Sequence, residues 1–145
     1  MRESSTRFAA SWHETIYADG STVYQPVLRT VVRGRDGPID QEFLIDSGAD
    51  VSMAPLDLFR KLGLRWRAGA RFPVQGISRR RSCALVGRLH EVDLLLPAAG
   101  ILMRIPMVFV RGDAPYVLGR DALFETFTIT FDPLRRRTIF ELLDR

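Results

Sequence analysis

The chain has 145 residues, of which 46% are hydrophobic and 26% are charged, a composition typical of one soluble globular domain and not of a disordered or fibrous protein. Its formal charge is +4, and arginine supplies nearly all of the positive charge because Lys61 is the only lysine. The longest apolar runs fall short of the roughly 20 residues of a membrane-spanning helix, and the N-terminus lacks the apolar core of a secretory signal. We therefore expect a cytosolic (cytoplasmic) protein without a membrane partner.

Metal and cofactor chemistry is not expected. Cys83 is the only cysteine, which excludes an internal disulfide and leaves too few thiols for a structural zinc site. The two histidines, His13 and His90, lie far apart and lack the spacing of metal ligands. The prediction is no bound metal and no cofactor.

The first 22 residues mix polar and apolar side chains without a sustained period, so we predict a flexible or loosely attached arm at 1–22 and one domain at 23–145. Two β-rich runs, 27–32 and 39–45, flank a hairpin signal at 34–38. Pro55 suits the first turn of a helix and Gly63 suits the position after its end. The sequence between them predicts a short helix over 55–62.

The second half continues with short apolar segments. Strand-like runs at 84–96 and 101–110 are separated by a turn at 97–100, and 127–131 with 138–140 form another hairpin pattern. A second short helical piece is expected near 120–124. Many short strands with only two short helices predict an all-β fold, a small closed barrel.

The most informative segment is the apolar run that ends in Asp46-Ser47-Gly48. An acidic residue, a small hydroxyl residue and a glycine after a strand place a carboxylate in a tight loop that another backbone can approach closely. The same residue types also form Asx turns and helix N-caps, and on these three letters alone a structural turn is the default interpretation.

This segment and a second motif further along the chain both resemble motifs of one protein family, and they occur in the same order as in that family. Leu44–Ala49 resembles the apolar pair followed by Asp-Thr/Ser-Gly-Ala of the retropepsins, the retroviral-type aspartic peptidases and their single-domain cellular and bacterial relatives. Val117–Leu123 resembles the second signature of that family, an apolar pair followed by Gly-Arg-Asp and further apolar residues. The resemblance covers roughly residues 27–140 and implies a barrel of the acid-protease type.

The resemblance also implies roles for individual residues. Asp46 would be catalytic, and Arg120 would pair with Asp50 and so join the second motif to the active loop. A flap, the hairpin that closes over substrate, would lie within 72–78, a segment with less glycine than viral flaps. The residues expected to support the active loop are Ser47, Gly48, Ala49, Asp50 and Arg120, and those expected in the flap are Val74, Gly76 and Ile77.

One Asp-Ser-Gly motif in 145 residues implies that a second copy supplies the matching aspartate, in a two-fold homodimer. Two carboxylates held a few ångströms apart share one proton. One Asp46 would then activate a water while the other polarises the scissile carbonyl of an extended peptide. The implied function is an aspartic endopeptidase that acts on peptide or protein substrates.

Two other functions are compatible with the sequence. The first is a catalytically inactive retropepsin-like module for dimerisation or peptide binding. The second is a small basic barrel that binds nucleic acid, suggested by the arginine triplets at 79–81 and 135–137. Each triplet lies between strand-like segments and is better interpreted as a solvated turn, so we expect no nucleic-acid partner.

Overall fold

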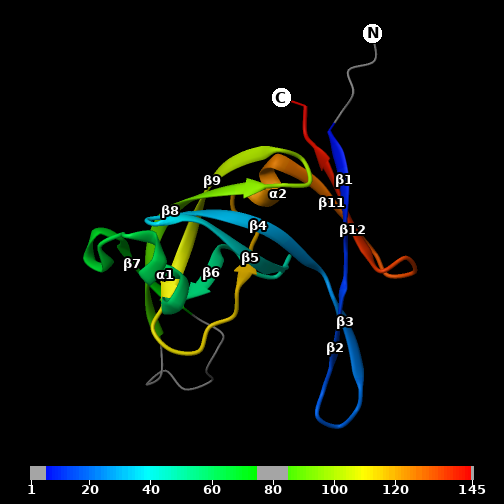
Figure 1. The fold of residues 1–145 in the computed structure, drawn as a ribbon, viewed down its shortest axis with the longest axis horizontal. Coiled ribbons are helices and arrows are strands. Elements are labelled where there is room, and N and C mark those ends of the chain that lie inside the picture. The colour runs from blue at the N-terminus through cyan, green and yellow to red at the C-terminus, as the bar shows by residue number, and fades with distance from the viewer. Residues whose placement is uncertain (1–5, 75–84, 145) are drawn as a thin grey trace.

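Most of the chain is β-strand in the computed structural model, which describes residues 6–74 and 85–144 (Figure 1). The strands are β1 (Arg7–Ser11), β2 (His13–Ile16), β3 (Thr22–Gln25), β4 (Val27–Gly34), β5 (Gly37–Ile45), β6 (Ser52–Pro55), β7 (Ala70–Val74), β8 (Leu85–Leu96), β9 (Ile101–Val110), β10 (Val117–Leu118), β11 (Phe127–Asp132) and β12 (Arg137–Leu142). The helices are α1 (Leu56–Leu62), the 3-10 turn η1 (Trp66–Ala68) and α2 (Leu123–Thr126).

The largest sheet closes into a barrel. Its strand order is β4-β5-β10-β6-β9-β8-β7. An additional pairing of β4 with β8 closes the six strands from β4 to β8 in this order into a ring. Inward-facing side chains fill the interior, and Phe43, Leu94, Ile105 and Met107 are almost completely buried there. The predicted all-β closed barrel with short helices is therefore confirmed.

Local signals placed several elements correctly. The turn between β4 and β5 pairs Gly34 with Gly37, within the predicted hairpin segment. Helix α1 begins just after Pro55 and ends at Leu62, and the φ of 72° at the next residue, Gly63, is the left-handed conformation that favours glycine. Helix α2 begins at Leu123, later than the predicted 120–124, because the residues before it hydrogen-bond to the loop at 46–50.

Residues 6–22, the described part of the segment for which we predicted a flexible or loosely attached arm, include strands β1 and β2. Strand β1 pairs antiparallel with β12, and β11 completes this three-stranded sheet. Phe8 stacks on Phe140 with ring centroids 4.7 Å apart, so part of the segment is packed against the body. Sequence periodicity could not show this, because the partner of β1 lies at the other end of the sequence. The domain boundary at residue 23 stays a prediction.

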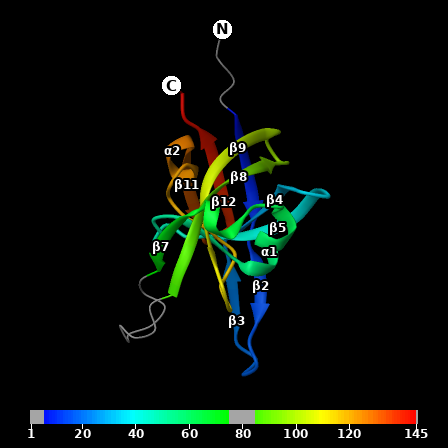
Figure 2. The same ribbon diagram turned by 90° about the vertical axis from the view of Figure 1, so that its left-hand side faces the viewer.

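Strands β2 and β3 form a separate two-stranded hairpin. The hairpin projects away from the barrel in both ribbon views (Figures 1 and 2). Between residues 6 and 144, outside the gap at 75–84, there is no helix with the length and apolar character required to cross a membrane.

Candidate active site

Asp46 follows β5 directly and begins a loop formed by residues 46–50. Its backbone N–H donates a hydrogen bond to the carbonyl oxygen of Leu118 at 3.0 Å, where β10 lies parallel to β5. The Asp46 side chain is half-buried, and Ser47 and Gly48 are exposed in the single chain. Two strand ends therefore hold the backbone of Asp46 while the loop that follows remains open to a partner or a substrate.

The loop is also a turn stabilised by its own aspartate. The backbone N–H of Gly48 donates to Oδ1 of Asp46 at 2.8 Å, and the N–H of Ala49 donates to the Asp46 carbonyl oxygen at 3.3 Å. This is the Asx-type turn that the three residue types suggest on their own. Such a turn is compatible with catalysis, because the bond from Gly48 fixes the orientation of the carboxylate.

The second motif packs against this loop through backbone contacts. The N–H groups of Arg120 and Asp121 donate to the carbonyl oxygens of Ala49 and Asp50, each at 2.9 Å. Gly119 is buried here, and a Cβ atom at this position would lie 2.7 Å from the Ala49 carbonyl oxygen. Glycine is needed at 119 because two backbones meet with no space for a side chain.

The side chains of Arg120 and Asp50 form an ion pair, the pair that the resemblance implies. The Arg120 side chain is 53% exposed and that of Asp50 is 84% exposed. An exposed pair contributes only about 0–1 kcal/mol to stability, so the backbone bonds do most to hold the two segments together. The structure thus brings Asp46, Asp50 and Arg120 into one region.

Ser52 belongs to the same region and was not among the predicted site residues. Its side chain is fully buried, and its hydroxyl oxygen accepts a hydrogen bond from the backbone N–H of Gly119 at 3.1 Å. A hydroxyl residue in the otherwise apolar strand β6 is a signal that could have drawn attention to it, since buried polar groups need partners.

The predicted flap is described only in part. Strand β7 pairs antiparallel with β8, and Val74 at its end is buried against Val108 and Val110. Gly76 and Ile77, the predicted tip, lie outside the described residues.

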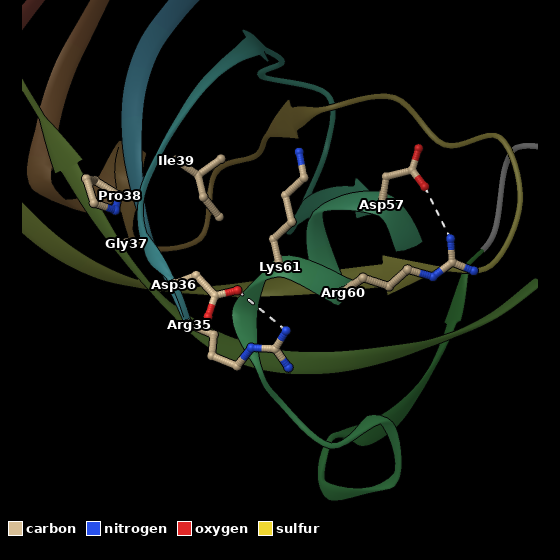
Figure 3. Close-up of a pocket in the computed structure, with 8 residues that line it drawn as sticks. All are labelled: Arg35, Asp36, Gly37, Pro38, Ile39, Asp57, Arg60 and Lys61. Carbon is tan, nitrogen blue, oxygen red and sulfur yellow. Dashed lines mark ion pairs between the residues drawn. The ribbon is translucent and has the colours of Figure 1, made fainter.

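A pocket between the β4–β5 turn and α1 is lined mainly by charged side chains, which pair locally (Figure 3). Arg35 contacts Asp36 and Arg60 contacts Asp57, each at 3.5 Å. In the part of the chain that the structure describes, no three His, Cys, Asp or Glu residues gather as metal ligands would.

The arginine triplet at 135–137 lies at the β11–β12 turn and has partners within the chain. Arg135 and Arg137 approach the Asp132 carboxylate at 3.4 and 3.6 Å. The guanidinium carbon of Arg136 lies 3.6 Å from the centre of the Tyr24 ring. These contacts give each arginine of this triplet a partner within the chain. The triplet at 79–81 lies outside the described residues. The absence of a nucleic-acid partner stays a prediction.

We compared the sequence and the structure with known proteins, and only the structure gave matches. No family model matches the sequence, and no curated protein matches it. Among solved structures, a retropepsin-like aspartic protease from Rickettsia conorii aligns with a TM-score of 0.61 and 14% identity, over 98% of this chain and 97% of that chain. The retroviral protease-like domain of Ddi1 from Leishmania major aligns with a TM-score of 0.55 and 16% identity, over 84% of this chain and 96% of that one. The chain has the fold of the retropepsin-like aspartic proteases.

Proposed function

We propose that this protein is an aspartic endopeptidase that works as a two-fold homodimer. The observation that carries the proposal is the position of Asp46, held between the ends of β5 and β10 with its carboxylate oriented by Gly48. The fold is shared with a protein named as a retropepsin-like aspartic protease and with a domain named as retroviral protease-like, and this supports the assignment.

A second copy is required because the sequence contains one Asp-Ser-Gly motif. In a two-fold dimer each chain presents the same loop to its partner, so the exposed Ser47 and Gly48 would face their counterparts near the axis. Hydroxyl hydrogen bonds from Ser47 would then join the two loops. The two Asp46 carboxylates would lie on either side of the axis and share one proton.

The proposed reaction is general acid–base hydrolysis. The ionised Asp46 takes a proton from a water while the protonated Asp46 of the second copy donates a hydrogen bond to the scissile carbonyl oxygen. The activated water adds to the carbonyl carbon, and the proton that the first carboxylate has taken up passes to the leaving amine as the C–N bond breaks. Neither a covalent intermediate nor a cofactor is needed.

The substrate class is an extended polypeptide. The small side chain of Ala49 and the open loop at Gly48 allow a peptide backbone to lie close to the carboxylates. Strand β7 leads into the segment where the flap is predicted, so a peptide between loop and flap would extend a sheet by backbone hydrogen bonds.

An Asp46→Asn variant tests the proposal. It keeps the size of the side chain and the acceptor for Gly48 but cannot act as a base, so cleavage of a peptide library should fall by about 10²- to 10⁴-fold. The matched control is Asp40→Asn, which changes an exposed aspartate paired with Arg29 on a barrel strand and should leave the rate unchanged. Equal processing by wild type and Asp46→Asn would contradict catalysis.

The same assay separates the inactive module from the peptidase. A wild-type protein that binds library peptides without cleaving them, and binds them equally after Asp46→Asn, would be a peptide-binding retropepsin-like domain. Specific activity should also rise with protein concentration through the range in which sedimentation shows the dimer forming.

A further inference from the structure

The hairpin of residues 13–25, here called the arm, consists of β2, β3 and the turn between them. Among the described residues it is a two-stranded sheet of its own, and both ribbon views show it projecting from the barrel (Figures 1 and 2). A two-stranded hairpin by itself is marginally stable in water and ordinarily needs a surface to pack on.

The arm carries three large apolar side chains that the single chain leaves exposed. The exposed fractions are 69% for Ile16, 48% for Tyr17 and 38% for Val23. The register pairs Ile16 with Thr22 and Thr15 with Val23, so Ile16 and Val23 lie on opposite faces of the hairpin. Apolar surface on both faces indicates a segment inserted between other surfaces, which the described residues of this chain do not supply.

The arm is rooted beside the candidate active loop. Strand β4 pairs antiparallel with β5, with Val27 opposite Leu44, and the N–H of Ile45 donates to the Pro26 carbonyl oxygen at 2.8 Å. Because β5 runs toward Asp46 and β4 runs away from it, the arm reaches Pro26 from beyond the Asp46 end of the sheet. In a dimer joined at the Asp46 loops, that end faces the second copy.

The base of the arm is fixed to its own chain on both sides. Nδ1 of His13 lies 2.9 Å from a Glu42 carboxylate oxygen, and Tyr24 lies under the Arg136 guanidinium. The backbone N–H of Trp12, just before the arm, donates to the Arg136 carbonyl oxygen at 2.8 Å. These contacts set the direction of projection, so the exposed tip is held in place before any partner binds.

The charge of the arm suits a second copy of this chain. Residues 13–25 include Glu14 and Asp19 and no lysine or arginine, whereas the whole chain has a formal charge of +4. The arm is therefore an acidic segment on a basic protein. The acidic arm of one copy is attracted to the net positive charge of the other, which favours association.

We propose that the arm clasps the second copy of the chain, with Ile16 and Tyr17 packed on the partner's surface next to the active loops. This inference rests on the proposed function, since it specifies how the homodimer is held together. It adds an interface element that the paired Asp46 loops do not require.

Photo-cross-linking tests where the arm lies. A benzophenone amino acid replaces Ile16 in one sample and Leu102 in the other. Leu102 is a matched control because it is also a strand residue and is 67% exposed. Equal amounts of ¹⁴N- and ¹⁵N-labelled protein are mixed, so mass spectrometry distinguishes products between chains from products within one chain.

Cross-links between chains from position 16 and not from position 102 are the expected result. A protein that sediments as a dimer but gives no cross-linked product between chains from position 16 would overturn the proposed contact of the arm with the second copy. The proposed peptidase dimer would remain. A protein that remains monomeric at every concentration would overturn both. Cross-linking of position 16 to added lipid vesicles or to another protein, in place of the second copy, would also overturn this proposed contact.

Truncation of the arm's apolar side chains gives a second measurement. Ile16→Ser combined with Tyr17→Ser should raise the dimer dissociation constant by about tenfold or more, while Leu102→Ser should leave it unchanged. Thermal unfolding at low concentration checks that the monomer still folds. An unchanged dissociation constant would overturn the clasp. Dimers that dissociate as expected but cleave no peptide would instead argue against the catalytic proposal alone.

Discussion

The backbone N–H of Gly119 donates a hydrogen bond to the hydroxyl oxygen of Ser52, 3.1 Å away and shielded from solvent. This bond joins the start of β6 to the segment that follows β10, on either side of the Asp46 loop. It ties together two parts of the sequence 67 residues apart. The position of the loop therefore depends on a contact that includes neither Asp46 nor a charged group.

Ser52→Ala should destabilise the protein by about 1–3 kcal/mol, because the N–H of Gly119 would stay buried without an acceptor. Chemical denaturation of the isolated protein measures the change in the free energy of unfolding. Ser11→Ala, at an exposed position on β1, is the control and should change stability by less than about 0.5 kcal/mol. A Ser52→Ala protein as stable as wild type would show that this bond contributes nothing.

Gly119→Ala should be more damaging than Ser52→Ala. The new Cβ would lie 2.7 Å from backbone atoms of Ala49 and Val51, which cannot move without displacing the active loop. We expect a loss of more than about 3 kcal/mol or failure to fold. Gly20→Ala is the control, since Gly20 has a φ of 83° but open space around it, and should cost about 1 kcal/mol. Comparable losses for the two variants would refute the steric argument.

Arg120→Ala and Asp50→Ala should show a coupling energy below about 1 kcal/mol in a double-mutant cycle of stability, because both side chains are largely exposed. If the pair aligns the active loop, Arg120→Ala should lower kcat of the proposed peptidase even though it changes the free energy of unfolding little. Arg29→Ala removes another largely exposed pair, with Asp40 on the barrel strands, and is the control for both measurements. A coupling of several kcal/mol would mean that the pair is a major stabilising contact.

The stability of the protein should fall as the pH drops below about 6.5. His90 is 8% exposed, and its Nε2 has no hydrogen-bond partner within the described residues. Burial lowers the pKa of His90 below its ordinary 6.5 and outweighs a hydrogen bond with the Trp66 backbone, which raises the pKa; the positive charge of Arg88 lowers it further. The unfolded chain therefore takes up this proton first, so stability is complete above about pH 6.5 and declines as the pH falls toward the lowered value.

Denaturation at a series of pH values checks this origin. His90→Leu should remove the decline that begins near pH 6.5, whereas Met107→Leu, which changes the residue opposite His90 in the sheet, should keep it. Hydrogen bonds from the Arg104 side chain and the Arg135 backbone lower the pKa of Asp93 and Asp132. The stabilisation from these carboxylates is lost only below about pH 4, outside the histidine range. The same slope in His90→Leu and wild type would exclude His90 as the cause.

Local patterns predicted the elements that depend on nearby residues. The hairpin around Gly34–Gly37 and the helix ending at Leu62 follow from turn and capping preferences of a few adjacent residues. The contact of Arg120 with Asp50 spans a larger distance in the sequence and was expected only because two motifs resembled one family.

What the sequence did not show depends on distant partners. The residues of β1 form a strand because β12 offers a free edge and Phe140 offers a stacking surface for Phe8. Ser52 was also missed, because its partner is a backbone group 67 residues away in the sequence and only its hydroxyl in an apolar strand indicates that it needs one. Short segments of mixed composition carry little signal until their partners are known.

The pairing of β1 with β12 has a consequence for how the chain is made. Synthesis proceeds from the N-terminus, so the first strand leaves the ribosome without its neighbour and stays unpaired until residues 137–142 have emerged. The pairing of β1 with β12 joins residues as distant in the sequence as Arg7 and Glu141, and contacts so widely separated form slowly. A nascent chain arrested before β12 should display Phe8 to solvent and present a site for a chaperone.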